Sequence, residues 1–405
     1  MENEPLPVGS FIESIVAVYH SLRFQPPAQQ YTILASLVLA ETHGQYKILS
    51  VATGTKCLPT NKLPSGGESV HDSHAEVLAR RGAMRWFLEE VGRCCGSANT
   101  PFQSDWIFLG TNGRYTLKDG AQLVLFISTV PCGDASMRFL ASSQDEQMAA
   151  LKDSTIYPPA DPNSAARGRD NYSLWGVLRT KPGRADSPPT TSMSCSDKIA
   201  AWNFLGIQGA LGSRFLRPLY ISRVIIGEVP ADMQNVVRED CERALWGRLG
   251  SIPDSGDYAL HRPMIQFTSV PFVHSRTTIA STALQVGGSC NDSLWWIADS
   301  AWPHEVLING LKRGVSPKHR HREKSRQGWP QACKISLLQL YHETLHLCGL
   351  PPEPDGATYL SVKQSMMDYQ VAKLSLLGEG ASFCGWIRGP SPQNFSSRAP
   401  AVHTT

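Results

Sequence analysis

The chain has 405 residues, of which 41% are hydrophobic and 18% are charged, with a net charge of +3. Ten Trp and thirteen Phe allow a sizeable core and argue against intrinsic disorder. The nearly balanced charge permits a local nucleic-acid-binding patch but does not by itself predict one. No apolar run approaches the roughly 20 residues that a membrane helix needs, which excludes a transmembrane protein.

The stretch from Met1 to Pro5 lacks the basic and apolar regions of a secretory signal. We therefore expect an intracellular protein, located in the nucleus, the cytoplasm or both. In that reducing environment the ten cysteines are expected to be free thiols or metal ligands, not disulfides.

Apolar periodicity predicts helices and strands in alternation along the chain. The helices are expected at 11–24, at 74–95, directly after Cys195, at 331–348 and at 359–377. The strands are expected at 33–39, 48–52, 123–128 and 220–228. A stretch rich in Pro, Ser, Arg and Asp at 157–192 predicts a long loop.

This alternation, without an internal repeat, predicts a single α/β domain with a helical C-terminal elaboration. We expect an N-terminal helix or extension over 1–29, the domain over 30–397 and a flexible tail over 398–405. Within the domain, 304–330 is a polar and basic insertion, and 331–397 carries the helical elaboration.

The sequence Asp72-Ser73-His74-Ala75-Glu76 opens the helix predicted at 74–95. A His and a Glu two residues apart can place an imidazole on a metal ion and a carboxylate beside the metal's water. Pro131-Cys132-Gly133-Asp134 follows a predicted strand and precedes a helix, whose dipole favours a thiolate. Zinc deaminases combine one His, two thiolates and a non-ligating Glu in this way.

The common Pro-Cys-x-x-Cys signature fails here, because Ala135 stands three residues after Cys132. The third protein ligand must therefore come from elsewhere in the chain. The best candidate is Cys195, which also lies just before a predicted helix. Alone, a His-x-Glu or a single cysteine more often has a structural role. Together they predict a zinc site made of His74, Cys132 and Cys195.

These motifs resemble the editing-type RNA adenosine deaminases, and so do Ser194-Cys195-Ser196-Asp197-Lys198 and Thr53-Gly54-Thr55-Lys56-Cys57. The resemblance runs from about residue 30 to residue 395 and is closest to the tRNA-specific branch. It implies a cytidine-deaminase-like, three-layer α/β/α fold and the zinc-dependent hydrolysis of adenosine to inosine.

The resemblance also implies roles for three residues. Glu76 would take a proton from the metal's water, protonate the purine ring and then protonate the departing ammonia. Thr55 and Lys56 would lie at the sugar and phosphate of the nucleotide, although an ordinary exposed turn is the alternative. No nucleotide cofactor is expected.

Two departures from the duplex-RNA editors of the family favour tRNA as the substrate. Residues 179–186 lack the glutamate that helps those editors to displace a base, and Ser136 replaces an arginine. An adenosine in an anticodon loop needs less help, because it is not held in a duplex. The tRNA-specific branch implies the adenosine just 3′ of the anticodon, position 37, of tRNA-Ala.

The helix predicted at 359–377 places Lys363 and Lys373 on its apolar side, at about 100° per residue. Such lysines must extend to solvent or meet a buried anion. The family buries one inositol hexakisphosphate, and the resemblance implies the same structural ligand here. Residues at the matching positions are Arg80, Arg81, Lys198, Lys334, Tyr359, Lys363, Tyr369, Lys373 and Trp386.

Two positions depart from that pattern, because Ala201 and Ala210 stand where an arginine and a serine are common. Asp72 and Lys181, together with Lys198, match a polar relay between this ligand and the zinc site.

Lysines and arginines crowd the segment 312–326, at Lys312, Arg313, Lys318, Arg320, Arg322, Lys324 and Arg326. Such a run is either a solvated loop or a source of salt-sensitive phosphate contacts. With tRNA as the expected partner we favour phosphate contacts.

Three other functions stay open at this point. An editor of other structured RNA is disfavoured by the missing glutamate. An inactive RNA-binding scaffold is disfavoured because Glu76 and all three expected ligands are present. A free-nucleoside deaminase is disfavoured by the basic segment and by the length of the chain.

Overall fold

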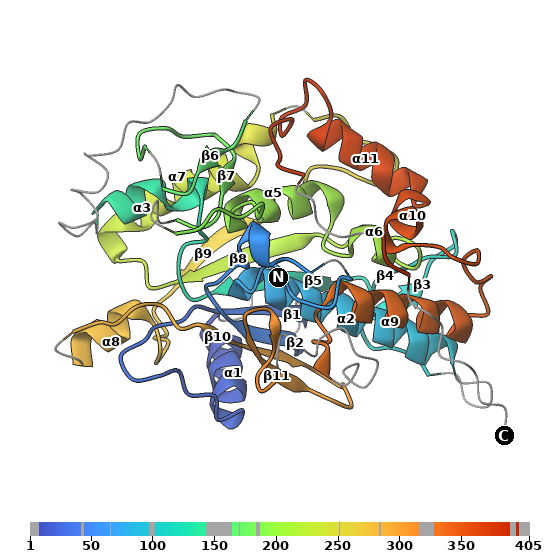
Figure 1. Ribbon diagram of the computed structural model, residues 1–405, viewed down its shortest axis with the longest axis horizontal. Helices are drawn as coiled ribbons and strands as arrows, with labels where there is room; N and C mark the ends of the chain where they lie inside the picture. Colours follow the sequence, from blue (N-terminus) through green and yellow to red (C-terminus); the bar gives the residue numbers. More distant parts are fainter. Residues whose placement is uncertain are drawn as a thin grey trace, which may run out of the picture.

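A computed structural model of the chain describes residues 8–41, 44–64, 66–96, 102–142, 164–169, 171–183, 187–250, 252–282, 285–315, 328–388 and 394–396. Its centre is an eight-stranded mixed sheet with the strand order β12-β11-β10-β2-β1-β5-β8-β9. Helices cover both faces of this sheet (Figure 1), which confirms the predicted α/β class. Within the described residues, no helix has both the length and the apolar character that a membrane span requires.

One half of the sheet follows the predicted strands closely. β1 (Leu34–Glu41) pairs antiparallel with β2 (Tyr46–Thr53) and with β5 (Ala121–Ile127). β5 then pairs in parallel with β8 (Ile221–Gly227), and β8 pairs in parallel with β9 (Met264–Thr268). Sequence analysis did not predict β9.

The other half was missed by the sequence analysis. β10 (Asp292–Ile297) pairs antiparallel with β2, and β11 (His304–Ile308) and β12 (Leu311–Lys312) extend the edge. The first part of the expected basic insertion at 304–330 therefore belongs to the sheet. Glu305 is buried there and pairs with Lys312, with 2.8 Å between Oε1 and Nζ. Because its charge is paired in this way, Glu305 can be buried in a strand near the edge of the sheet.

Alternation along the central strands produces the layers, because successive side chains point to opposite faces. Leu37, Leu125 and Val224 share a core with α2 (Ala75–Cys95), α5 (Cys195–Leu205) and α7 (Gln234–Leu245). Their neighbours Val38, Val124 and Ile225 pack against α1 (Val8–Ser21) on the opposite face. The result is the expected arrangement of helix, sheet and helix.

Within the described residues, the C-terminal elaboration has three helices, on the side of the domain that carries α2. α9 (Lys334–Leu347) lies along α2 (Figure 1), and α10 (Tyr359–Gln364) and α11 (Met367–Leu377) follow. The prediction of one continuous helix over 359–377 is wrong. Met366 interrupts it with a ψ of 72°, and side chains satisfy the last carbonyls of α10: Ser365 donates to Val362 O and Gln370 donates to Lys363 O.

Smaller elements lie between these. They are η1 (Thr60–Lys62), β3 (Ile107–Leu109), β4 (Tyr115–Leu117), η2 (Asp134–Ser136), α3 (Met137–Ser142), β6 (Ala166–Arg167), β7 (Arg179–Thr180), α6 (Gly209–Gly212), η3 (Ala231–Met233), η4 (Gly247–Leu249) and α8 (Arg276–Thr282). β6 and β7 pair in parallel within the stretch predicted as a long loop.

Candidate metal centre and active site

The three expected metal ligands come from three separate elements and meet at one point. His74 is the residue before α2, Cys132 lies between β5 and η2, and Cys195 is the first residue of α5. Nδ1 of His74 lies 3.8 Å from Sγ of Cys132 and 3.5 Å from Sγ of Cys195. All three ligand atoms lie within 4.8 Å of one another.

These separations fit a tetrahedral zinc ion. With Zn–S bonds of about 2.3 Å and Zn–N bonds of about 2.0 Å, a sulfur and a nitrogen ligand lie about 3.6 Å apart. The charges fit as well. Burial and the neighbouring Cys132 raise the pKa of Cys195, whereas the hydrogen bond from Cys195 lowers the pKa of Cys132. Two sulfurs in such a position share a proton unless a cation lies between them, so the donor set calls for a metal ion.

Cys57 gives a second possible metal group with Asp72 and His74. Asp72 is already engaged by two lysine ammonium groups, Lys181 and Lys198. The group of His74, Cys132 and Cys195 is therefore the better candidate, because among the described residues only one of its ligands, Cys195, is contacted by a lysine ammonium group, that of Lys181.

Glu76 lies in the first turn of α2, two residues after His74. Its side chain is buried, and its Oε2 has no hydrogen-bond partner among the described residues. Burial, followed by the charge of Cys132, raises the pKa of Glu76. A buried carboxyl group with an unused oxygen and a raised pKa is suited to pick up and release a proton.

The expected relay residues form one hydrogen-bonded group around Asp72. Its Oδ2 accepts from Lys181 Nζ at 2.8 Å, from Ser192 Oγ at 2.5 Å and from Lys198 Nζ. Burial alone would raise the pKa of Asp72, but the charges of Lys181 and Lys198 hold it well below its usual range. Ser192, which also accepts from Lys198 at 2.7 Å, was missed in the sequence because nothing local marks it.

The same group touches the metal ligands. Oδ1 of Asp72 accepts from the backbone N–H of His74 at 3.0 Å, and Lys181 Nζ donates to Cys195 Sγ at 3.1 Å. The relay therefore orients one ligand through its backbone and places a positive charge beside another.

Thr55 and Lys56 lie beside His74. The N–H of Ser73 donates to Lys56 O, and the N–H of Ala75 donates to Gly54 O. Gly54 permits this approach, because a Cβ there would come within 1.9 Å of Ser73 O.

Both of these side chains are engaged with the segment before β10. Thr55 Oγ1 donates to Cys290 O at 3.3 Å, and Lys56 Nζ donates to Ser289 Oγ at 2.9 Å. Burial lowers the pKa of Lys56. The alternative of an ordinary exposed turn does not describe this half-buried pair.

The expected polyanion site begins one turn further along α2, with Arg80 and Arg81. Around them lie side chains from α9, α10 and α11, namely Lys334, Tyr359, Lys363 and Tyr369, and Lys373 is a neighbour of Lys363. Trp386, in the segment after α11, packs against Phe383. Among the described residues, no carboxylate forms an ion pair with Arg80, Arg81, Lys363 or Lys373.

Burial sets the pKa values in this second pocket, and neighbouring cations add to its effect. The pKa is lowered to about 10 for Arg80, to about 7 for Lys334, and to about 8 for both Lys363 and Lys373. Nε of Arg80 is buried and has no hydrogen-bond partner in the described part of the chain. Lys198, which was expected here, binds Asp72 and so belongs to the relay as well.

Two aromatic rings lie against these cations and help to hold them. Lys363 Nζ lies 5.0 Å from the ring centre of Tyr359, and the Arg80 guanidinium lies 5.1 Å from that of Trp202. Cation–π contacts of this kind offset only a small part of the cost of burying several charges. The donor set therefore fits a buried ligand that carries many negative charges.

Other residues singled out in the sequence have structural contacts. Ser136 is buried and donates to Gly133 O. Lys312 and Arg313 pair with Glu305 and Asp292. The remaining basic residues of the segment 312–326 lie outside the described residues, as do 184–186 and the expected tail at 398–405.

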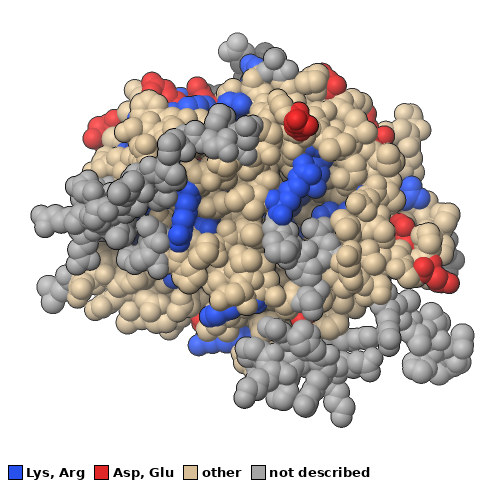
Figure 2. Space-filling view, turned by 45° about the horizontal axis from the view of Figure 1, so that its top comes forward, with Lys and Arg blue, Asp and Glu red and all other residues tan. Residues whose placement is uncertain are grey.

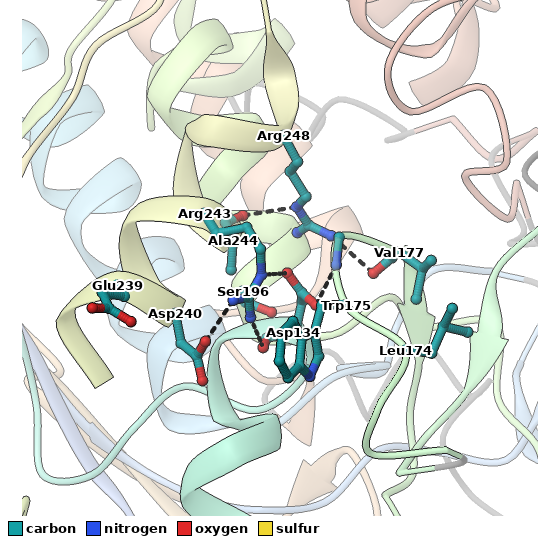
Figure 3. A network of polar contacts seen from close by, with 12 residues as sticks. Asp134, Leu174, Trp175, Val177, Ser196, Glu239, Asp240, Arg243, Ala244 and Arg248 are labelled. Atoms are coloured by element: carbon teal, nitrogen blue, oxygen red, sulfur yellow. Dashed lines mark hydrogen bonds and ion pairs between the residues drawn. The ribbon is translucent and has the colours of Figure 1, made fainter. Parts of the chain in front are cut away.

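A network of buried charges supports both cysteine ligands, and sequence reasoning missed it (Figure 3). Asp134 accepts from Arg243 Nε at 3.2 Å, and Asp197 pairs with Arg248 Nη2 at 2.6 Å. Both acids follow a cysteine ligand by two residues, and both are fully buried. The only local signal was the capping pattern of Ser194 and Asp197, in which the Ser194 side chain accepts from the Asp197 N–H.

Comparison with known proteins agrees with this arrangement. Residues 50–390 match the family described as "Adenosine-deaminase (editase) domain". The chain is 30% identical to the tRNA-specific adenosine deaminase 1 of Schizosaccharomyces pombe over 325 residues, which cover 78% of each chain. It is also 30% identical to the protein of that name in Drosophila melanogaster over 392 residues, or 90% of each chain.

A third relative has a different substrate in its name. The chain is 31% identical to the double-stranded RNA-specific editase Adar of Drosophila melanogaster over 389 residues. These cover 89% of this chain and 51% of that protein. The resemblance expected from the motifs is thereby confirmed at the level of the family.

Proposed function

Because the chain belongs to the adenosine-deaminase (editase) domain family, we propose that it hydrolyses adenosine to inosine and ammonia in tRNA. The observation that carries this proposal is the meeting of His74, Cys132 and Cys195 within 4.8 Å, beside the buried and unpartnered Oε2 of Glu76. Two of the relatives described above are named as tRNA-specific. We propose the adenosine at position 37 of tRNA-Ala as the target, and the nucleus, the cytoplasm or both as the location.

The chemistry follows from the residues at the site. His74, Cys132 and Cys195 would hold Zn²⁺, which, when bound, lowers the pKa of a water molecule toward neutrality. Glu76 would accept a proton from the attacking water and give it to N1 of the adenine ring as the oxygen adds to C6. Glu76 would then take the remaining proton of the added hydroxyl group and deliver it to the amino group, so that the C6–N bond breaks, ammonia leaves and inosine remains.

The remaining residues of the chain hold this arrangement in place. Lys181 donates to Cys195 Sγ and favours its thiolate form. Asp72 fixes the backbone of His74 at the start of α2. Thr55 and Lys56, on the neighbouring segment, would bind the hydroxyl and phosphate groups of the target nucleotide.

The second pocket would hold inositol hexakisphosphate as a structural ligand. Arg80, Arg81, Lys334, Lys363 and Lys373 would bind its phosphates, because several buried cations can then be neutralised by one ligand. Tyr359, Tyr369 and Trp386 would line the pocket. On the face in Figure 2, separate groups of Lys and Arg lie near the middle, with an acidic group just above the larger of them and most other acidic groups toward the rim. Such basic groups would meet RNA phosphates.

The direct test is to incubate the purified chain with total tRNA and to sequence the products for adenosine-to-inosine changes. Glu76→Gln should lower the rate by about 10²- to 10⁴-fold, because it removes the proton-transfer group. Its zinc content, measured by mass spectrometry, should equal that of the unchanged protein, whereas Cys195→Ala should lose the metal. Inosine formation by Glu76→Gln at the unchanged rate would refute the mechanism.

An editor of other structured RNA is the second candidate, and the similarity to the double-stranded RNA-specific editase favours it. The same experiment with a long RNA duplex separates the two candidates. Inosine in the duplex and none in tRNA would replace the proposed substrate. Binding of tRNA without any inosine would instead indicate an inactive scaffold.

A further inference from the structure

Trp175 is a large apolar side chain that stands at the surface close to the candidate active site. Its side chain is 49% exposed, although burying a Trp normally stabilises a fold. Its only polar atom is already satisfied, because Nε1 donates to Tyr172 O at 2.9 Å. What Trp175 presents to the solvent is therefore an aromatic surface.

The backbone on both sides of Trp175 is held by buried charged groups (Figure 3). The N–H of Gly176 donates to Asp134 Oδ1 at 2.8 Å. The guanidinium of Arg179, which is fully buried, donates to Leu174 O at 2.6 Å and to Asn171 O at 3.1 Å. The ring is thus presented from a fixed turn, which lowers the entropy lost when a partner binds.

Two arginines approach the indole ring, and both lie on one side of it. The guanidinium carbons of Arg138 and Arg243 lie 5.4 Å and 5.5 Å from the ring centre. Both guanidiniums bind the same oxygen, Oδ1 of Asp240, at 2.8 Å and 2.5 Å. Their carbons are therefore no more than about 8 Å apart, whereas on opposite faces of the ring they would be about 11 Å apart.

The opposite face of the indole is covered by neither guanidinium, in agreement with its exposure. The two arginines are also poor candidates for phosphate binding. Arg138 is paired with Asp240 and Glu239, and Arg243 is paired with Asp240 and Asp134. Their charges are offset, so the open ring face is the feature that can bind a partner.

The position of this face relates it to the reaction. Asp134, which binds the N–H next to Trp175, follows the metal ligand Cys132 by only two residues. Two residues span at most about 7 Å, so the turn that carries Trp175 is anchored directly beside the segment that supplies one metal ligand. An adenosine taken out of an RNA loop leaves its neighbours unstacked, and unpaired bases stack readily on aromatic side chains.

We propose that Trp175 stacks on an unpaired base that neighbours the target adenosine. This inference rests on the proposed function, because it assumes an RNA loop at the metal centre. It assigns Trp175 to substrate binding and to the preference for an unpaired neighbouring nucleotide.

The test uses an anticodon stem-loop with 2-aminopurine beside the target, whose fluorescence is quenched by stacking. Trp175→Ala should weaken binding by roughly 5- to 100-fold and remove the quenching, while Trp175→Phe should retain most of both. The dependence of binding on salt should not change, since no phosphate contact is lost. Zinc content and thermal stability should also stay as in the unchanged protein.

Trp302 provides a matched control. It is 77% exposed and lines a hollow of about 580 Å³ between the C-terminal half of α2 and α9. That half of α2 ends at Cys95, about 29 Å along the helix axis from Glu76. Trp302→Ala should therefore bind the stem-loop as the unchanged protein does.

Three results would overturn the proposal. Unchanged binding by Trp175→Ala would remove the side chain from the interface. Equal weakening in Trp175→Ala and Trp175→Phe with a loss of thermal stability would give it a packing role, and a changed salt dependence would indicate phosphate binding. If the unchanged protein forms no inosine, the proposed function fails separately. In that case the fluorescence measurement still tests the stacking: quenching that depends on Trp175 supports it, and the absence of such quenching overturns it.

Discussion

The metal centre and the polyanion pocket lie on the same helix, α2, but they handle charge in opposite ways. At the start of α2, Asp72 is matched by Lys181 and Lys198, and two cysteine sulfurs face a histidine. One turn further along α2, Arg80 and Arg81 begin a second group of cations, which includes Lys363 and Lys373. Among the described residues, no carboxylate forms an ion pair with any of these four side chains. The charges at the metal centre are nearly balanced, whereas those of the second group are not.

The difference shows which pocket depends more on its ligand. A buried charge without a partner lowers the free energy of unfolding by several kcal/mol unless a group of opposite charge neutralises it. The metal centre keeps its shape through hydrogen bonds that the chain supplies by itself. In the proposed polyanion site, by contrast, the buried cations repel one another until an anion binds.

The largest effect is expected from replacing the lysines of the unbalanced pocket. Lys363→Met combined with Lys373→Met should abolish the phosphorus content of the purified protein and most of its soluble yield, because the anion loses two binding groups. Lys62→Met, at an exposed lysine in η1, should leave both unchanged. A soluble and active double variant without phosphorus would show that the pocket needs no anion.

A smaller but still large effect is expected at the balanced pocket. Asp72→Asn leaves the buried Lys181 and the partly buried Lys198 without their partner and should lower the free energy of unfolding by about 3–5 kcal/mol. Urea titration measures this change. Glu239→Gln is the control, because Glu239 is 67% exposed in its pair with Arg138 and its removal should cost less than about 1 kcal/mol. An unchanged midpoint for Asp72→Asn would mean that the lysines have another partner.

The smallest effect is a difference in pH dependence. Burial lowers the pKa of Lys334 to about 7 and of Lys363 and Lys373 to about 8, so without an anion the folded state binds fewer protons than the unfolded state. The cost of burying these charges is complete at low pH and disappears as the pH rises toward the usual lysine pKa of about 10.4. Refolding yield without inositol hexakisphosphate should therefore rise between pH 7 and pH 10.

With the ligand in excess, its negative charges stabilise the protonated lysines and this rise should be absent or reversed. Refolding yield can be followed by Trp fluorescence in both series. The same pH trend with and without the ligand would contradict the assignment of the pocket.

Local sequence patterns were sufficient to predict where the helices that carry His74 and Cys195 begin. His74 and Cys195 each stand at the beginning of a helix, and Ser194 caps α5 in the way that its spacing with Asp197 suggests. Periodicity drew attention to Lys363 and Lys373 alone, and the other polyanion residues came from a family pattern. Periodicity alone predicted one helix where the structure has α10 and α11, because side-chain bonds to carbonyls compete with helix continuation.

Long-range contacts were beyond local reasoning. Ser192 binds Asp72 across 120 residues, and Arg243 binds Asp134 across 109. β10 could have been predicted, since Ser293-Leu294-Trp295-Trp296-Ile297 is a short run of residues that favour strands. β11 could not, because its Glu305 is acceptable in the sheet through two partners, Lys312 and the backbone N–H of Gln331, that a local pattern does not reveal.

The order of these residues along the chain has a consequence for biosynthesis. A ribosome delivers His74, Cys132 and Cys195 long before Lys363 and Lys373 emerge. α2 already packs on β1 and β2, but Arg80 and Arg81 meet their neighbours on α9, α10 and α11 only after the last segments are translated. A message cut short before α10 would encode every proposed zinc ligand and yet yield a polypeptide that lacks part of the proposed anion site.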